Sequence, residues 1–150
     1  MRQDKIDIIS AQTVAFSATV AESAEYGAGD VAQFGVVLSN VGGAYDSSTG
    51  VFTCPNTGLY AFYVSVYTAA TQQFQGLLLH DAVSGNDVTP LHVNVDMQNR
   101  NIAGRQSSNL QTIVCAAGDT VHVEVEGSGQ ILFAGYPFPT FSGYILQEFF

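Results

Sequence analysis

The chain has 150 residues and a formal net charge of −9, because thirteen acidic side chains outnumber four lysines and arginines. Nucleic acids and anionic lipids are bound through clustered cations, so this composition disfavours both as partners. The apolar runs are far shorter than the roughly 20 residues that span a bilayer, which argues against membrane insertion.

Short strand-like segments follow one another along the chain, and none has long helical periodicity. Aromatic and β-branched residues are abundant, only 11% of residues are charged, and fifteen glycines recur at short intervals. In chain order, the expected strands are Val14–Val20, Val31–Leu38, Val51–Thr53, Leu59–Thr68, Gln73–His80, Leu91–Met97, Asn109–Cys115, Thr120–Glu126, Gln130–Ala134 and Phe141–Phe149. Loops or turns are expected at Asn40–Ser48, Ser84–Asp87, Gln98–Ser108 and Gly127–Gly129. About eight to ten such strands predict one all-β domain, a sandwich or jelly roll of two sheets.

Some of these strands are apolar on one side and others on both. The segments Leu91–Met97 and Thr120–Glu126 alternate between apolar and polar residues, which predicts one buried and one wet face for each. In Leu59–Thr68, by contrast, Tyr60 and Phe62 lie on one side while Ala61 and Tyr63 lie on the other. A sheet that is apolar on both faces needs two covers. One is the second sheet, and the simplest candidate for the other is a second copy of the chain.

Several separated motifs carry a family resemblance. Tyr45, Gly50, Phe52, Gly58, Tyr60 and Phe62 are spaced as a turn and two strands, and Gly118-Asp119 and Phe141-Ser142-Gly143 follow in order. In this pattern the chain resembles the globular head domain of complement C1q, within the C1q and tumour-necrosis-factor-like superfamily, and specifically its single-domain invertebrate members.

The resemblance implies a jelly roll of about ten strands that assembles as a compact homotrimer, with residues 1–13 as an extension and 14–150 as the domain. Its core and fold residues would be Phe16, Phe52, Tyr60, Phe62, Gly118, Asp119, Phe141 and Gly143. The family is secreted and binds ligands without catalysis, so we expect no enzyme activity and no required cofactor. No Gly-X-Y repeat is present, so no collagen stalk is expected. The first residues show no signal peptide; either Met1 follows a removed one, or the protein leaves the cell by another route.

Cys54 and Cys115 permit one intramolecular bridge. The resemblance places them at the start and end of antiparallel neighbouring strands, where a disulfide would form in an oxidising compartment. Two buried free thiols are the equally weighted alternative.

Exposed imidazole and carboxylate together form a typical zinc ligand set. The wet faces supply His92, Asp96, His122 and Glu124, although a solvated polar surface is the simpler interpretation, and His80 would join them if Leu77 and Leu79 face inward. Calcium is a second possibility, because some members of the resembled family hold it near the trimer apex. Asp96 falls near one such position, but Gly104 or Arg105 falls near the other, and a guanidinium opposes cation binding. Asp87 or Asp81 could substitute for the missing carboxylate.

Polar loops at one end of a rigid sandwich are the natural recognition surface. Asn99, Arg100 and Arg105 could bind an acidic or hydroxyl-rich sugar, with Tyr136 or Phe138 stacking on its ring. The resemblance to invertebrate members then implies a secreted, lectin-like pattern-recognition protein of innate immunity that binds microbial glycans. A secreted receptor ligand and a metal-handling or structural extracellular protein are the alternatives.

Overall fold

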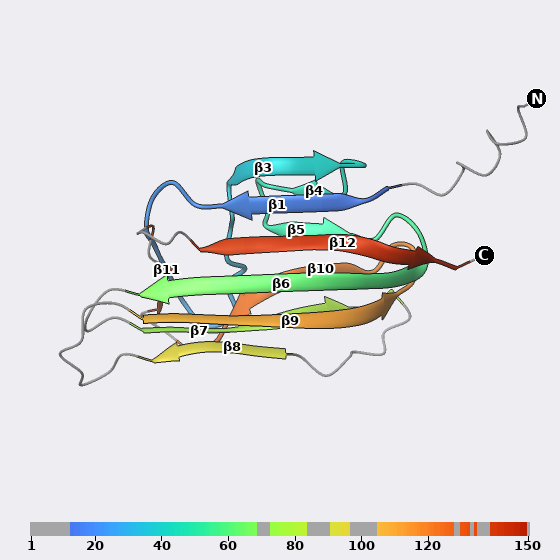
Figure 1. Cartoon of the computed structure of the whole chain (residues 1–150). Coiled ribbons are helices and arrows are strands. Elements are labelled where there is room, and N and C mark those ends of the chain that lie inside the picture. Colours follow the sequence, from blue (N-terminus) through green and yellow to red (C-terminus); the bar gives the residue numbers. More distant parts are fainter. Residues whose placement is uncertain are drawn as a thin grey trace, which may run out of the picture.

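The computed structural model describes residues 13–68, 73–83, 91–96, 105–127, 130–132, 134 and 139–149. Within them the chain is all-β, as predicted, with twelve strands and no helix (Figure 1). The strands are β1 (Ala15–Thr19), β2 (Ala24–Tyr26), β3 (Val36–Val41), β4 (Tyr45–Asp46), β5 (Val51–Thr53), β6 (Gly58–Thr68), β7 (Gln73–Asp81), β8 (Leu91–Asp96), β9 (Arg105–Cys115), β10 (Thr120–Val125), β11 (Gln130–Leu132) and β12 (Thr140–Glu148).

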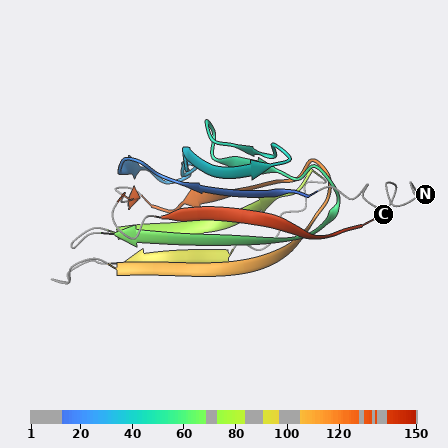
Figure 2. The ribbon, with the colours of Figure 1, turned by 45° about the horizontal axis from the view of Figure 1, so that its top comes forward.

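Ten of these strands form two five-stranded sheets that stack face to face (Figures 1 and 2). The first sheet has the order β3-β1-β12-β6-β9, and the second has the order β4-β5-β10-β7-β8. Strands β2 and β11 form a separate small pair. Long crossings between antiparallel neighbours, such as β1 beside β12, give the jelly-roll sandwich that the sequence predicted.

The core lies between the two sheets and is filled by alternate side chains of each strand. On β6, Tyr60, Phe62 and Val64 are fully buried, which is the side that the alternation assigns to the core. The aromatic rings that fill the core with them include Phe16 and Phe141 of the same sheet and Phe52 of the second sheet, and these rings stack or meet edge to face.

Two glycines make this packing possible. A Cβ atom on Gly143 of β12 would lie 2.6 Å from Cδ1 of Phe62 and 2.8 Å from Cε1 of Phe16, so only a hydrogen atom fits there. Gly118 has a φ angle of +94° in the turn that joins β9 to β10, a conformation that favours glycine. That turn brings Asp119 to the end of the core.

Several strand boundaries differ from the prediction. The expected strand Val31–Leu38 is divided: Ala32 bonds to the edge of β10 through Val123, and only β3 joins the first sheet. The expected loop at 98–108 is shorter, because β9 begins at Arg105, opposite Thr68 of β6. Strand β4 lies inside the expected loop at 40–48. There the Asn40 side-chain amide donates to the Tyr45 carbonyl through Nδ2 and accepts the Tyr45 N–H through Oδ1. Strand β2 was not expected.

Candidate functional site

The first sheet carries most of the large apolar side chains that are exposed in the described residues. They are Val36, Val37, Leu38 and Val41 of β3, Leu110 and Val114 of β9, and Tyr144 and Leu146 of β12. On the face turned away from the second sheet, Leu110 lies opposite Tyr63, and Tyr144 lies opposite Ala61. Apolar surface gathered on one sheet in this way is typical of an interface.

The second sheet has a polar outer face. The strand register places His92 opposite Leu77, and Leu77 opposite Glu124, so His92 and Glu124 belong to one row across β8, β7 and β10. Asp96 lies opposite Gln73, and Asn94 lies opposite Gln75. Both residues are an even number of positions from His92, so they lie on the same face as that row. The side chains of β8 lie outside the described residues, so the four residues predicted to bind zinc share a face by register only.

The prediction that His122 is exposed is wrong. Its side chain is buried because β10 lies inside the second sheet, with Leu79 of β7 directly opposite and β5 on the other edge. Its Nε2 atom lies 3.3 Å from Oε1 of Glu124, which is partly exposed. The imidazole therefore already has a carboxylate partner.

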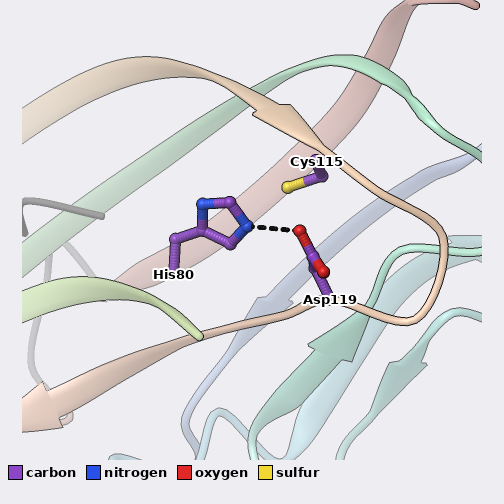
Figure 3. A group of neighbouring side chains, drawn as sticks. All are labelled: His80, Cys115 and Asp119. Atoms are coloured by element: carbon purple, nitrogen blue, oxygen red, sulfur yellow. Dashed lines mark hydrogen bonds and ion pairs between the residues drawn. The ribbon is translucent and has the colours of Figure 1, made fainter. Parts of the chain in front are cut away.

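His80 lies on the inner face of the second sheet rather than with the outer set. Phe74 and Leu78 share its side of β7 and are buried, while Leu77 and Leu79 point outward beside Glu124 and His122. The condition under which His80 would join the outer set is not met. Instead its ring points toward Asp119 and Cys115 (Figure 3).

Asp119 is held by three hydrogen bonds. Its Oδ2 atom lies 2.8 Å from Nε2 of His80 and accepts the Ala116 N–H, while Oδ1 accepts the Val83 N–H, both at 2.9 Å. Burial would raise the pKa of this carboxyl, but the bonds from Val83, His80 and Ala116 together hold it below its usual value. Asp119 is therefore an ionised, buried carboxylate. The other ring nitrogen of His80, Nδ1, is buried without a hydrogen-bond partner among the described residues.

Cys115 completes what we call the buried cluster: His80, Cys115 and Asp119. One ligand atom from each lies within 4.8 Å of the others, and all three residues are buried. Cys54 adjoins the cluster, because its N–H bonds the carbonyl of Asp119 and its own carbonyl accepts the Gly118 N–H. The structure has no bridge between the two cysteines, and both are buried. A hydrogen bond with Cys115, and then burial, raises the pKa of the Cys54 thiol, so Cys54 stays protonated.

Sequence reasoning missed the buried cluster as a unit. Asp119 was expected only as one of the core and fold residues, and the alternation of β7 did not decide the direction of His80. The predicted sugar-binding residues Asn99, Arg100, Tyr136 and Phe138 lie outside the described residues, and Arg105 is the first residue of a strand rather than a loop residue.

A further hollow, which the sequence did not indicate, lies between β2 and the start of β3. It has a volume of about 430 Å³, and its lining includes Glu22, Ser23, Tyr26 and Gln33. The Tyr26 hydroxyl accepts the Gln33 N–H at 3.1 Å. Carboxylate, hydroxyl and amide groups beside an aromatic ring are suited to a hydroxyl-rich ligand.

Comparison with protein families shows that the model of the C1q domain matches residues 15–146. Among curated proteins, the heavy metal-binding protein HIP of Mytilus edulis is 28% identical over 146 residues, and caprin-2 of Danio rerio is 28% identical over 144 residues. These alignments take in 96% and 90% of this chain, but only 65% of HIP and 14% of caprin-2.

Solved structures share the fold at low identity. The globular domain of zebrafish complement 1qA has a TM-score of 0.74 at 18% identity, covering 92% of this chain and all of that one. The Eiger TNF of S. frugiperda has a TM-score of 0.74 at 12% identity, with 93% and 96% coverage, and murine APRIL at pH 5.0 has 0.68 at 13%, with 90% and 100% coverage.

Proposed function

Because the chain belongs to the C1q domain family, we propose that it is an extracellular ligand-recognition module that works as a homotrimer. Proteins with this domain are typically secreted, and the family is generally non-enzymatic. No helix in the described part of the chain has the length and apolar character needed to cross a membrane. The single observation that carries the proposal is the apolar surface of the first sheet, which an isolated chain would expose to water.

Three copies around an axis would cover that surface. Tyr144 and Leu110 lie on the face of the first sheet that the second sheet leaves uncovered, and the family fold supports a threefold arrangement. Obligate interfaces of this kind are large and apolar, and a cyclic arrangement closes without leaving an apolar edge for further copies.

Light scattering should therefore give about three times the mass of one chain. Tyr144→Asp combined with Leu110→Asp should shift the protein toward monomer, because two charges would be desolvated in each interface. Val83→Asp is the matched control: Val83 is also a large exposed apolar residue, at 70%, but it lies outside the first sheet. A wild-type monomer at micromolar concentration would refute the assembly.

For the ligand, we propose a microbial glycan, which would make the protein a lectin of innate immunity. The low number of cations disfavours polyanions, and the hollow lined by Glu22, Tyr26 and Gln33 offers polar groups beside a ring. The residues predicted from the sequence, Asn99, Arg100, Arg105, Tyr136 and Phe138, remain the other candidate contacts. A trimer presents each site three times, so avidity could raise weak binding by roughly 10² on a repeating surface glycan.

A glycan array probed with the trimer tests this ligand. Binding that weakens on Arg100→Ala or Arg105→Ala would support the loop surface, and binding that weakens on Gln33→Ala would support the hollow. An array without binders, together with saturable binding to a cell-surface protein, would favour the alternative of a secreted receptor ligand.

Metal handling is the second candidate function, and the buried cluster is the observation that favours it. His80, Cys115 and Asp119 offer nitrogen, sulfur and oxygen donors within 4.8 Å of one another. The relative HIP is named as a heavy metal-binding protein, which supports the same class of function here. Equilibrium dialysis of the reduced protein against Zn²⁺ or Cd²⁺ should retain about one ion per chain. Retention no greater than that of a metal-indifferent control protein would exclude this function.

A further inference from the structure

We propose that the buried cluster is the site of a thiophilic divalent cation, of the Zn²⁺ or Cd²⁺ class, and that a disulfide between Cys115 and Cys54 closes it. The inference rests on the second candidate function, metal handling. It adds where the metal binds and how oxidation of the cysteines would prevent binding. It replaces the outer-face residues His92, Asp96, His122 and Glu124 as the place where metal binds.

The spacing of the donors suits such an ion. Zinc bonds of about 2.0–2.3 Å at tetrahedral angles separate neighbouring ligand atoms by roughly 3.3–3.8 Å. In the buried cluster Nε2 of His80 and Oδ2 of Asp119 are 2.8 Å apart, and all three donors lie within 4.8 Å. Binding therefore requires the first pair to open and the sulfur to approach, each by less than about 1.5 Å, which small side-chain rotations can supply.

The charges also balance. Asp119 accepts the N–H groups of Val83 and Ala116, as a carboxylate does, and Cys115 would lose its thiol proton to the solvent on binding. The two anions would then neutralise a divalent ion in a buried place. His80 must bind through Nε2 with its own proton on Nδ1. Nδ1 is buried without a hydrogen-bond partner among the described residues, so in this tautomer its N–H would need a water molecule or a small shift to find an acceptor.

The donor types choose among metals. A thiolate and an imidazole select zinc and its softer relatives, whereas calcium takes six to eight oxygen ligands, so the buried cluster does not suit calcium. The outer face has no cysteine, since the two cysteines of the chain, Cys54 and Cys115, are both buried. The path from solvent to the buried cluster is short, because Ala116, Ala117 and Gly118 in the turn that covers it are exposed.

Cys54 supplies the control. Cys54 is tied to the turn that follows Cys115: its N–H bonds the carbonyl of Asp119, its carbonyl accepts the Gly118 N–H, and both cysteines are fully buried. Cys115 also raises the pKa of the Cys54 thiol, which agrees with two neighbouring sulfurs. A low-molecular-weight disulfide such as oxidised glutathione would take two electrons from the pair: the two thiols become one Cys54–Cys115 disulfide, and the reagent leaves as two thiols. Oxidation removes the only thiolate of the site, so binding should require the reduced protein.

Cadmium titration of the reduced, full-length wild-type chain tests the proposal. We expect the ultraviolet sulfur-to-cadmium charge-transfer band, saturating at one ion per chain. Cys115→Ser should weaken binding by more than the roughly 10- to 100-fold that outer partners of a metal site contribute. His122→Gln, on the opposite face of the same sheet, is the matched control and should change the affinity less than about 2-fold. Circular dichroism identifies a variant that fails to fold. In that case the sulfur-to-cadmium band of the wild type alone tests whether a cysteine binds the ion.

The outcomes separate the two proposals. A wild type that retains no cadmium overturns both metal handling and this site. Cadmium retained without a sulfur band, or lost on His122→Gln but not on Cys115→Ser, leaves metal handling in place and overturns the buried site. Wild-type protein oxidised by glutathione disulfide, with the bridge verified by mass spectrometry, should bind no cadmium until it is reduced again. Unchanged binding by the bridged protein would overturn the control by Cys54.

Discussion

Two histidine–carboxylate pairs lie on the second sheet, one on each of its faces. His80 and Asp119 meet at 2.8 Å on the inner face, with only 4% and 5% of their side chains exposed. His122 and Glu124 meet at 3.3 Å on the outer face, where 34% of the Glu124 side chain is exposed. The pairs have similar chemistry, but the inner carboxylate is more deeply buried and has further hydrogen bonds, so the contrast between them shows what those surroundings add.

We expect the inner pair to contribute more to stability than the outer pair. Asp119 also accepts the N–H groups of Val83 and Ala116, so it ties the end of β7 to the turn before β10. Glu124 has water as an alternative partner, and exposed ion pairs contribute little to stability. Glu124 could therefore be substituted at little cost to the fold, whereas Asp119 holds part of the fold in place.

The largest expected effect is that of Asp119→Asn. The amide NH₂ would face a backbone N–H donor on one side, and the inner pair would lose its charge, so we expect the free energy of unfolding to fall by about 3 kcal/mol or more. Urea denaturation measures it, with Glu124→Gln as the control. A loss below about 1 kcal/mol would remove the distinction between the two pairs.

A change of pH should sharpen the contrast with a smaller effect. The folded-state pKa of Asp119 lies below its usual 3.8, so its stabilisation is complete above the unfolded pKa of about 3.9 and is lost as the pH falls through the folded value. The difference in unfolding free energy between wild type and Asp119→Asn should therefore narrow below about pH 4. The pKa of Asp46 is also lowered, mainly by Ser48, but that residue is common to both proteins and cancels. A difference that widens toward pH 3 would contradict the assignment.

The smallest expected effect belongs to the outer pair. His122→Gln and Glu124→Gln should each change the free energy of unfolding by less than about 1 kcal/mol, since the pair is partly solvated and salt-screened. The same urea series in low and high salt measures this. A loss that matches that of Asp119→Asn would show that the burial of His122 outweighs the partial exposure of Glu124.

The sequence predicted the fold because most strands alternate clearly. On β6 the alternation identified Tyr60 and Phe62 as core residues, and both are fully buried. It was less informative at β9, where the polar residues Gln106, Ser107 and Ser108 suggested a loop although they pair with β6. A strand at the edge of a sheet can be polar on both sides, because water covers what neighbouring strands do not.

The buried cluster was beyond sequence reasoning for a different reason. In β7 the residues from Gly76 to Leu79 are all apolar or small, so alternation cannot tell which side faces inward, and the packing of Phe74 and Leu78 decides that His80 does. The local bond from Asp119 to Ala116 was foreseeable. Its bonds to Val83 and His80 join residues 36 and 39 positions apart, and only the folded chain brings them together.

The position of β12 has a consequence for how the protein is made. This strand lies in the middle of the first sheet, between β1 and β6, so Phe16 near one end of the domain pairs with Gly143 near the other. While the ribosome is still translating the residues before β12, β1 and β6 each lack a partner along one edge. The first sheet cannot close until nearly the whole domain has emerged, and its apolar strands must be shielded until then, a task for chaperones that hold nascent chains.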